Sequence, residues 1–154
     1  MWSTIAVPLD LKRCVALERF EFTVELQSVS EVHDWILQTV RTITSPLFNE
    51  FVIWILRTTF HRWGQLWSLS KEGLKAVDAS LNVIAGRNPN FRLVFQGDFS
   101  GEYGVIRHVV GIDYLPLASS KGYMMFEQAE DEESPLFKSG VLYPDSLDYT
   151  QLFC

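Results

Sequence analysis

Residues 49–56, NEFVIWIL, contain six consecutive apolar side chains from Phe51 to Leu56, and this stretch decides the fold class. A membrane-spanning helix needs about 18 or more apolar residues, whereas this run is closed by Glu50 and Arg57. A short apolar run that is rich in aromatic and β-branched residues is typical of a buried strand. We therefore predict a central strand, apolar on both faces, and no membrane span.

Similar runs elsewhere in the chain favour strands over short core helices. With NEFVIWI (49–55), they are ERFEFTV (18–24), NFRLVFQ (90–96) and GYMMFEQ (122–128). Their anchor residues Phe20, Phe51, Phe91 and Met124 are 31, 40 and 33 residues apart. Strands that alternate with helices pair in parallel, and a repeat of this length is typical of a curved solenoid. The sequence predicts an α/β fold of this kind.

The segments between these runs favour helices. Apolar residues recur at helical spacing in 28–45 and in 70–86, and Ser45-Pro46 ends the first pattern. Ser28 or Ser30 is the candidate N-cap of the first helix; Ser70 and Gly86 are the candidate N-cap and C′ residue of the second.

Residues 100–121 are the least regular part of the chain. Residues 104–112 fit either a further strand or a bent helix. Pro116 can occupy the first position of a short helix that Gly122 closes.

The charges divide the chain into a neutral body and an acidic tail. Residues 1–126 hold twelve acids and twelve bases, whereas residues 127–154 hold seven acids and one base. We therefore predict a domain over 1–126 and a tail over 127–154. The run EQAEDEESP (127–135) suits a solvated, disordered tail or a docking segment for a basic partner. Apolar residues beyond it favour a third role, a cap over the end of the solenoid. They are Leu136, Phe137, Leu142, Tyr143, Leu147 and Phe153.

Composition excludes several functions. The sequence has no dense basic stripe of the kind that binds nucleic acid. Its two cysteines, Cys14 and Cys154, are too few for a disulfide framework or a zinc site. Either one fits a reactive thiol, although Cys14 better fits a small apolar group beside a strand. With no signal peptide, these features predict an intracellular protein, cytoplasmic or nuclear.

No motif predicts a catalytic, cofactor or metal site. GDFSGEYG (97–104) does not match a phosphate-binding loop. His33 fits a cap or a solvated face at a helix start, and His61 fits a solvated loop without neighbouring metal ligands. His108 lies in an apolar run and fits a semi-buried structural group. A small α/β enzyme remains the alternative, and it needs a pocket where His61 or His108 meets Asp98 or Asp113.

Two stretches match the leucine-rich-repeat phrase L-x-x-L-x-L, namely Leu17-x-x-Phe20-x-Phe22 and Phe48-x-x-Phe51-x-Ile53. Together with LKRCVALERFEF, SPLFNEFVIWI, NPNFRLVF and LPLASSKGYMMF, they resemble the C-terminal region of fungal (basidiomycete) F-box proteins over about residues 10–127. In that family a degenerate leucine-rich-repeat-like region follows a helical F-box that docks on the adaptor of a ubiquitin ligase.

The chain departs from that family at its start. MWSTIAVPLDLKRCVALE is too short for an F-box, so adaptor binding is not expected. The resemblance implies a non-enzymatic domain that binds a protein partner, without the ligase half. A fragment of a longer gene product, with no independent function, is a further alternative.

Strand alternation predicts the binding surface. If Phe20, Phe51 and Leu93 face the core, the neighbouring residues face the opposite, concave side of the sheet. The predicted partner-binding residues are Glu21, Thr23, Val52, Trp54, Arg92 and Val94. Trp54 with Arg92 forms a candidate hot spot, because both residue types are enriched at such sites. In the alternative, this face is covered and Val52, Trp54 and Val94 belong to the core.

Overall fold

A computed structural model describes residues 8–24, 29–55, 71–130 and 133. Its strands are β1 (Arg19–Val24), β2 (Glu50–Ile55), β3 (Arg92–Gly97) and β4 (Met124–Gln128). Its helices are α1 (Val29–Arg41), α2 (Lys71–Arg87), α3 (Val105–Val109) and α4 (Pro116–Lys121), with a short 3-10 turn, η4 (Gly101–Gly104), and a π-helix, η5 (Val110–Tyr114).

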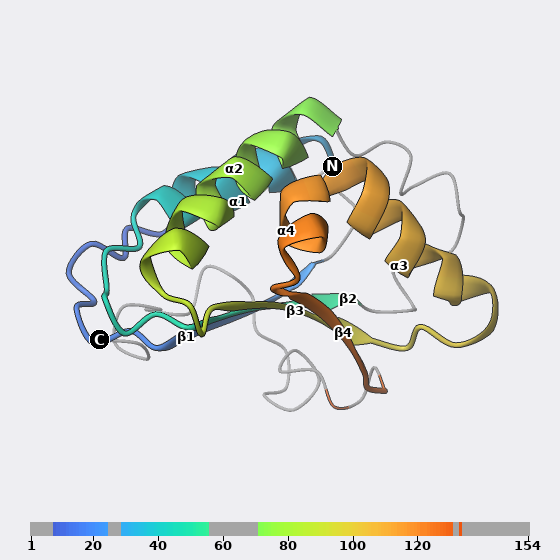
Figure 1. Ribbon diagram of the computed structural model, residues 1–154. Helices are drawn as coiled ribbons and strands as arrows, with labels where there is room; N and C mark the ends of the chain where they lie inside the picture. Colours follow the sequence, from blue (N-terminus) through green and yellow to red (C-terminus); the bar gives the residue numbers. More distant parts are fainter. Residues whose placement is uncertain (1–7, 25–28, 56–70, 131–132, 134–154) are drawn as a thin grey trace, which may run out of the picture.

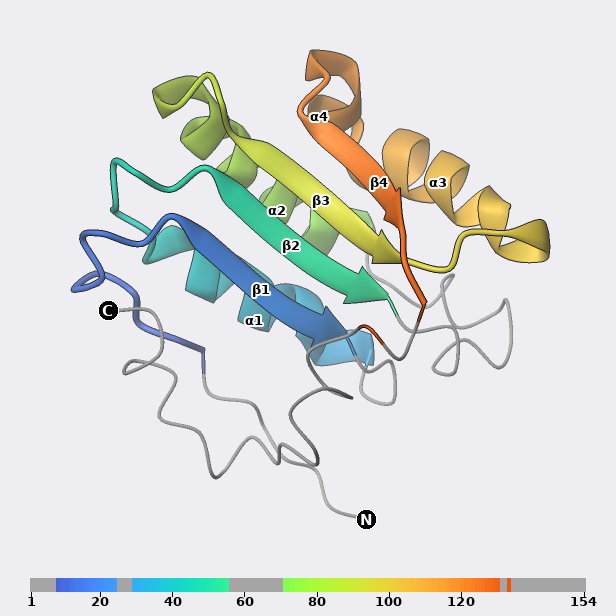
Figure 2. The same cartoon turned by 90° about the horizontal axis from the view of Figure 1, so that it is seen from below.

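The four strands form one parallel sheet in the order β1-β2-β3-β4. Each strand therefore pairs with the next strand along the chain. Helices α1, α2, α3 and α4 lie on one side of this sheet (Figure 1), and the view from the other side shows the strands in front of the helices (Figure 2). The predicted α/β fold with parallel strands and alternating helices is confirmed.

The register places Phe20, Phe51, Leu93 and Met124 side by side across the sheet. These equivalent positions are 31, 42 and 31 residues apart. The predicted anchor Phe91 is therefore wrong by two residues. Because side chains alternate with a period of two, a shift of two residues keeps the same face inward, and the sequence pattern does not reveal it.

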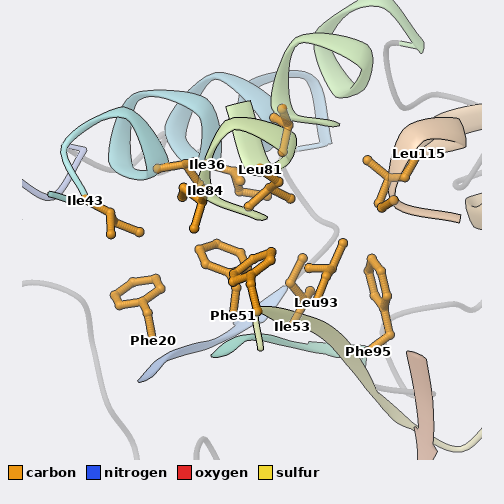
Figure 3. Packing of buried hydrophobic residues seen from close by; sticks show 14 of the residues in the cluster. Phe20, Ile36, Ile43, Phe51, Ile53, Leu81, Ile84, Leu93, Phe95 and Leu115 are labelled. Atoms are coloured by element: carbon orange, nitrogen blue, oxygen red, sulfur yellow. The ribbon is translucent and has the colours of Figure 1, made fainter. Parts of the chain in front are cut away.

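The core lies between the sheet and the helices. Phe20, Phe51, Ile53, Leu93 and Phe95 point from the strands toward the helical layer (Figure 3). Their helix-side neighbours in this cluster include Ile36 from α1, Leu81 and Ile84 from α2, and Leu115 before α4. The Phe51 ring lies within 5.6 Å of the Phe20 ring and 5.5 Å of the Phe22 ring, centroid to centroid. Aromatic packing thus binds neighbouring strands together on this face.

Helices α1 and α2 follow the predicted spacing, with Ile36 and Val40 buried in α1 and Val77, Leu81 and Ile84 buried in α2. The candidate caps Ser28 and Ser70 lie outside the described residues. Ser30 and Gly86 lie within helices, so neither is the predicted cap. The helix continues past Gly86 because the Asn88 amide still donates to the Ile84 carbonyl at 3.1 Å.

Residues 104–112 form the bent helix rather than the strand. Helix α3 passes into η5, whose last turn has the Leu115 amide bonded to the Val110 carbonyl at 2.9 Å. Pro116 opens α4 and Gly122 closes it with φ 77°, as predicted.

The start of α4 is capped by a side chain from α2. Buried Asp78 accepts hydrogen bonds from the Leu117 amide at 2.7 Å and the Ala118 amide at 3.0 Å. These two amides have no partner within their own helix. A carboxylate is favoured there because helix N-termini carry partial positive charge, so Asp78 ties two successive units together.

Side chains also connect the loops that precede the strands. Thr44 donates to the Lys12 carbonyl at 3.1 Å, Ser45 to the Val15 carbonyl at 3.0 Å, and Asn88 to the Phe48 carbonyl at 3.0 Å. The loops before β1, β2 and β3 are therefore neighbours along one edge of the sheet. We call this edge, where helices end and strands begin, the strand-start edge.

Candidate binding face

The side of the sheet turned away from the helices is the candidate binding face, and we call it the open face. Its described side chains come from alternating positions of the four strands. They are Arg19, Glu21, Glu50, Val52, Trp54, Arg92, Val94, Gln96, Met125 and Glu127. Five of the six predicted partner-binding residues are among them. The sixth, Thr23, pairs with Trp54 in the register, but its side chain is not among those that the structure describes.

A charged row crosses the beginning of this face. Glu50 is only 8% exposed and lies in register between Arg19 and Arg92. The two arginines donate to its two carboxylate oxygens at 2.5 Å and 2.6 Å. Arg19 also contacts the Glu21 carboxylate at 3.2 Å. A buried carboxylate needs such partners to offset the cost of its desolvation, and the arrangement holds both guanidinium groups in place.

A small apolar cluster lies beside the charged row. Val52 and Val94 are fully buried, Trp54 is 5% exposed, and Met125 and Ala129 pack against them. The core interpretation of Val52, Trp54 and Val94 is therefore confirmed, and they are not exposed contact residues. The half-exposed side chains of Arg19 and Arg92 are the groups here that reach solvent.

Polar contacts bound the cluster on two sides. The Trp54 indole N–H donates to the Glu21 carboxylate, and the Gln96 amide donates to Glu127 at 2.6 Å. The indole therefore has its polar atom satisfied while its rings are buried. Sequence reasoning missed Glu50 as the centre of the charged row. The sequence did carry a signal for this row. Arg19, Glu50 and Arg92 each come directly before an inward-facing residue of their strand, and these inward-facing residues are paired across the sheet.

The residues proposed for an enzyme do not meet in a described pocket. His61 lies outside the described residues, and His108 is exposed on α3, so the prediction of a semi-buried His108 is wrong. Asp98 accepts hydrogen bonds from Ser100 and Gln128, at 2.5 Å and 2.7 Å. Within the described part of the chain, no group of three metal-ligating side chains is present.

A depression of about 150 Å³ lies instead near the strand-start edge. Among the described residues, its lining has one charged side chain, Arg87, and includes Ile43, Pro46, Ile84 and Asn88. No acid or histidine of the described ranges lines it, so these residues do not supply the proton-transfer groups that the enzyme alternative requires.

His33 lies in the contact between the two long helices. The Nδ1 atom of His33 is buried without a hydrogen-bond partner, and its Nε2 lies 3.4 Å from the Asp34 carboxylate. A side chain at Gly73 of α2 would collide with the imidazole. His33 thus packs between the helices, instead of being the predicted cap or solvated residue.

Cys14 and Tyr123 carry two further groups of a kind that can be reactive. Cys14 is buried before β1 and is not a free thiol, so the reactive-thiol alternative is wrong for it. Cys154 lies outside the described residues, and the cytoplasmic or nuclear location stays a prediction.

Burial, reinforced by the negative charge of Asp78, raises the pKa of Tyr123 to about 12. Its buried hydroxyl has no hydrogen-bond partner.

Comparison with known proteins adds no assignment. No protein-family model, curated protein or solved structure matches the chain. None of the helices in the described ranges is long and apolar enough to cross a membrane.

Proposed function

We propose that this chain is a non-enzymatic protein-binding domain with an irregular leucine-rich-repeat-like architecture, and that the open face carries its binding surface. The supporting observation is the arrangement of the described elements: four parallel strands in sequential order with their helices on one side only. All-parallel sheets are usually covered by helices on both faces. On the face without described helices, the half-exposed arginines Arg19 and Arg92 beside the buried cluster are the groups that can reach another protein.

The repeat character of the domain has two further supports. Equivalent strand positions recur after 31, 42 and 31 residues, and the loops before successive strands are joined by side-chain hydrogen bonds. In repeat proteins each unit packs mainly on its neighbours, and a curved face serves as the binding surface. With the resemblance to fungal F-box proteins, these features favour a role like that of the substrate-recognition region of such a protein, without adaptor binding.

The charged row would be the polar contact of this surface. Arg19 and Arg92 are about half exposed, and Glu50 fixes both guanidinium groups before any partner arrives. Side chains that are already ordered lose less entropy on binding, and arginine is enriched among residues that dominate interfaces. Glu21, beside Trp54, would be the negatively charged contact of the same surface.

Site-specific photo-crosslinking tests this proposal. A benzophenone amino acid replaces Gln96 on the open face in one variant and Val83, exposed on α2, in the other. After irradiation in cells, the Gln96 variant should form a crosslink to a discrete partner protein, and the Val83 variant should not. Crosslinks from Val83 alone, or from neither position, would contradict the proposed surface.

A further inference from the structure

The strand-start edge collects most of the described basic side chains. Seven of the ten Lys and Arg residues in the described ranges lie along it. They are Lys12, Arg13, Arg19, Arg41, Arg87, Arg92 and Lys121. In sequence these residues are scattered over 110 positions, which is why no basic stripe is visible there. The fold brings them together because every described helix that returns to the sheet ends at this edge.

Contacts between the loops support this juxtaposition. The loop of Lys12 is bonded to Thr44, close to the end of α1 at Arg41. Asn88, directly after Arg87, is bonded to Phe48 in the loop before β2. Lys121 ends α4 directly before β4, the neighbour of β3.

The net charge of this edge is opposite to that of the chain. Against seven cations, the acids along the same edge or paired with its cations are Asp10, Glu18, Glu21 and Glu50, which gives 7 − 4 = +3. The whole chain carries −6. Five of these cations are exposed and form no ion pair within the described residues: Lys12, Arg13, Arg41, Arg87 and Lys121.

Helix stabilisation explains only part of this cluster. Arg41, Arg87 and Lys121 end their helices, where a cation is favoured by the helix dipole. Lys12 and Arg13 lie in a loop, so the dipole gives no reason for their positions. Two apolar side chains are exposed in the same loops, Val15 at 67% and Leu47 at 51%.

We propose that the strand-start edge binds an acidic polypeptide segment of a partner protein, one that carries apolar side chains between its acids. This inference rests on the proposed protein-binding function and adds a second surface to the open face. Val15 and Leu47 would contact the apolar side chains, while the surrounding cations pair with the acids. Aromatic groups, on which unpaired bases stack, are absent from the large exposed apolar residues of the described ranges, and this favours a polypeptide over a single-stranded nucleic acid. A duplex is bound through its phosphates, so it serves as the competing probe in the test.

The test uses fluorescein-labelled poly-L-glutamate and a labelled 20-base-pair DNA duplex as probes, measured by anisotropy at low and moderate salt. The whole chain should bind poly-L-glutamate, more weakly as salt rises. Lys12→Glu with Arg87→Glu should weaken that binding at least about tenfold, because four units of charge change at the edge. The matched control Lys71→Glu with Lys75→Glu, at the opposite end of α2, should leave it within about twofold.

An acidic peptide with Leu between its Glu residues should bind more tightly than poly-L-glutamate of equal charge, and Val15→Ser with Leu47→Ser should abolish that difference. Equal losses in the two charge variants, no binding at all, or tighter binding of the duplex would each overturn the inference. These outcomes leave the crosslink from Gln96 unaffected, because Gln96 lies outside the strand-start edge, so failure here is distinguishable from failure of the proposed function.

Discussion

The two faces of the sheet are built by the same strands, but they differ in chemistry. On the helix-covered face, aromatic rings from neighbouring strands and apolar helix residues form the main core. On the open face, a compact cluster of Val52, Trp54 and Val94 lies between charged and polar rows. The first face stabilises the domain by burial alone. The second combines burial with fixed charges, and this difference makes it the candidate for recognition.

The largest expected effect comes from the helix-covered face. Phe51→Ala removes a fully buried ring that packs against Phe20, Phe22 and Phe48. The free energy of unfolding should fall by about 4 kcal/mol, measured by urea denaturation followed by circular dichroism. Val15→Ala, at an exposed position, is the control and should change it by less than about 0.5 kcal/mol. Equal stability of the two variants would mean that Phe51 is not central to the core.

Trp54→Ala should come next and test whether the open face is also a core. Its indole is buried and its N–H is bonded to Glu21, but its cluster is smaller than the one around Phe51. We expect a loss of about 3 kcal/mol in the same denaturation experiment. An unchanged unfolding free energy would restore the sequence-based view of Trp54 as an exposed contact residue.

Glu50→Gln should have an intermediate effect, because it keeps the size of the side chain and removes its charge. Two charge-assisted hydrogen bonds become weaker, and the two guanidinium groups lose their common counter-ion. A loss of about 2 kcal/mol is expected. The exposed pair of Glu72 with Lys75 supplies the control, since Glu72→Gln should cost less than about 0.5 kcal/mol. Similar values for both variants would show that the charged row is not fixed by burial.

The smallest effect at neutral pH is expected for Tyr123→Phe, which removes a buried hydroxyl without a hydrogen-bond partner. The change should be less than about 1 kcal/mol. At alkaline pH the variant is more informative. The folded-state pKa of about 12 exceeds the ordinary value of 10, so the unfolded state loses its proton first. Stability that is fully present below pH 10 is therefore lost as pH rises toward 12.

Urea denaturation at several alkaline pH values measures this contribution as the difference between wild type and variant. Tyr114, whose pKa burial also raises, is present in both proteins and cancels. A parallel pH dependence of the two proteins would contradict the burial of Tyr123.

The sequence predicted the strands and the long helices because their signals are local. Six consecutive apolar residues around Phe51 require burial, and the 3.6-residue spacing of α1 and α2 requires an apolar helix face. The alternation of side chains along each strand also predicted which residues share the open face. Pro116 and Gly122 marked the ends of α4 because their backbone preferences are local properties too.

Features that depend on contacts between distant segments were not predictable in the same way. Whether Val52 and Val94 are buried depends on what surrounds them, which alternation does not encode. Asp78 caps a helix that begins 38 residues later, so its role appears only when α2 and α4 are adjacent. The basic strand-start edge likewise exists only after the helices return to the sheet.

Two adjacent methionines on opposite faces of the sheet allow recognition through the open face to be measured directly. Met124 pairs with Leu93 on the helix-covered face, and Met125 pairs with Val94 on the open face. Both are half-buried, so hydroxyl-radical footprinting with tandem mass spectrometry can follow each one in the free protein and in its complex with the crosslinked partner. The partner should protect Met125 from oxidation and leave the oxidation of Met124 unchanged. Protection of Met124, or of neither residue, would contradict recognition through the open face.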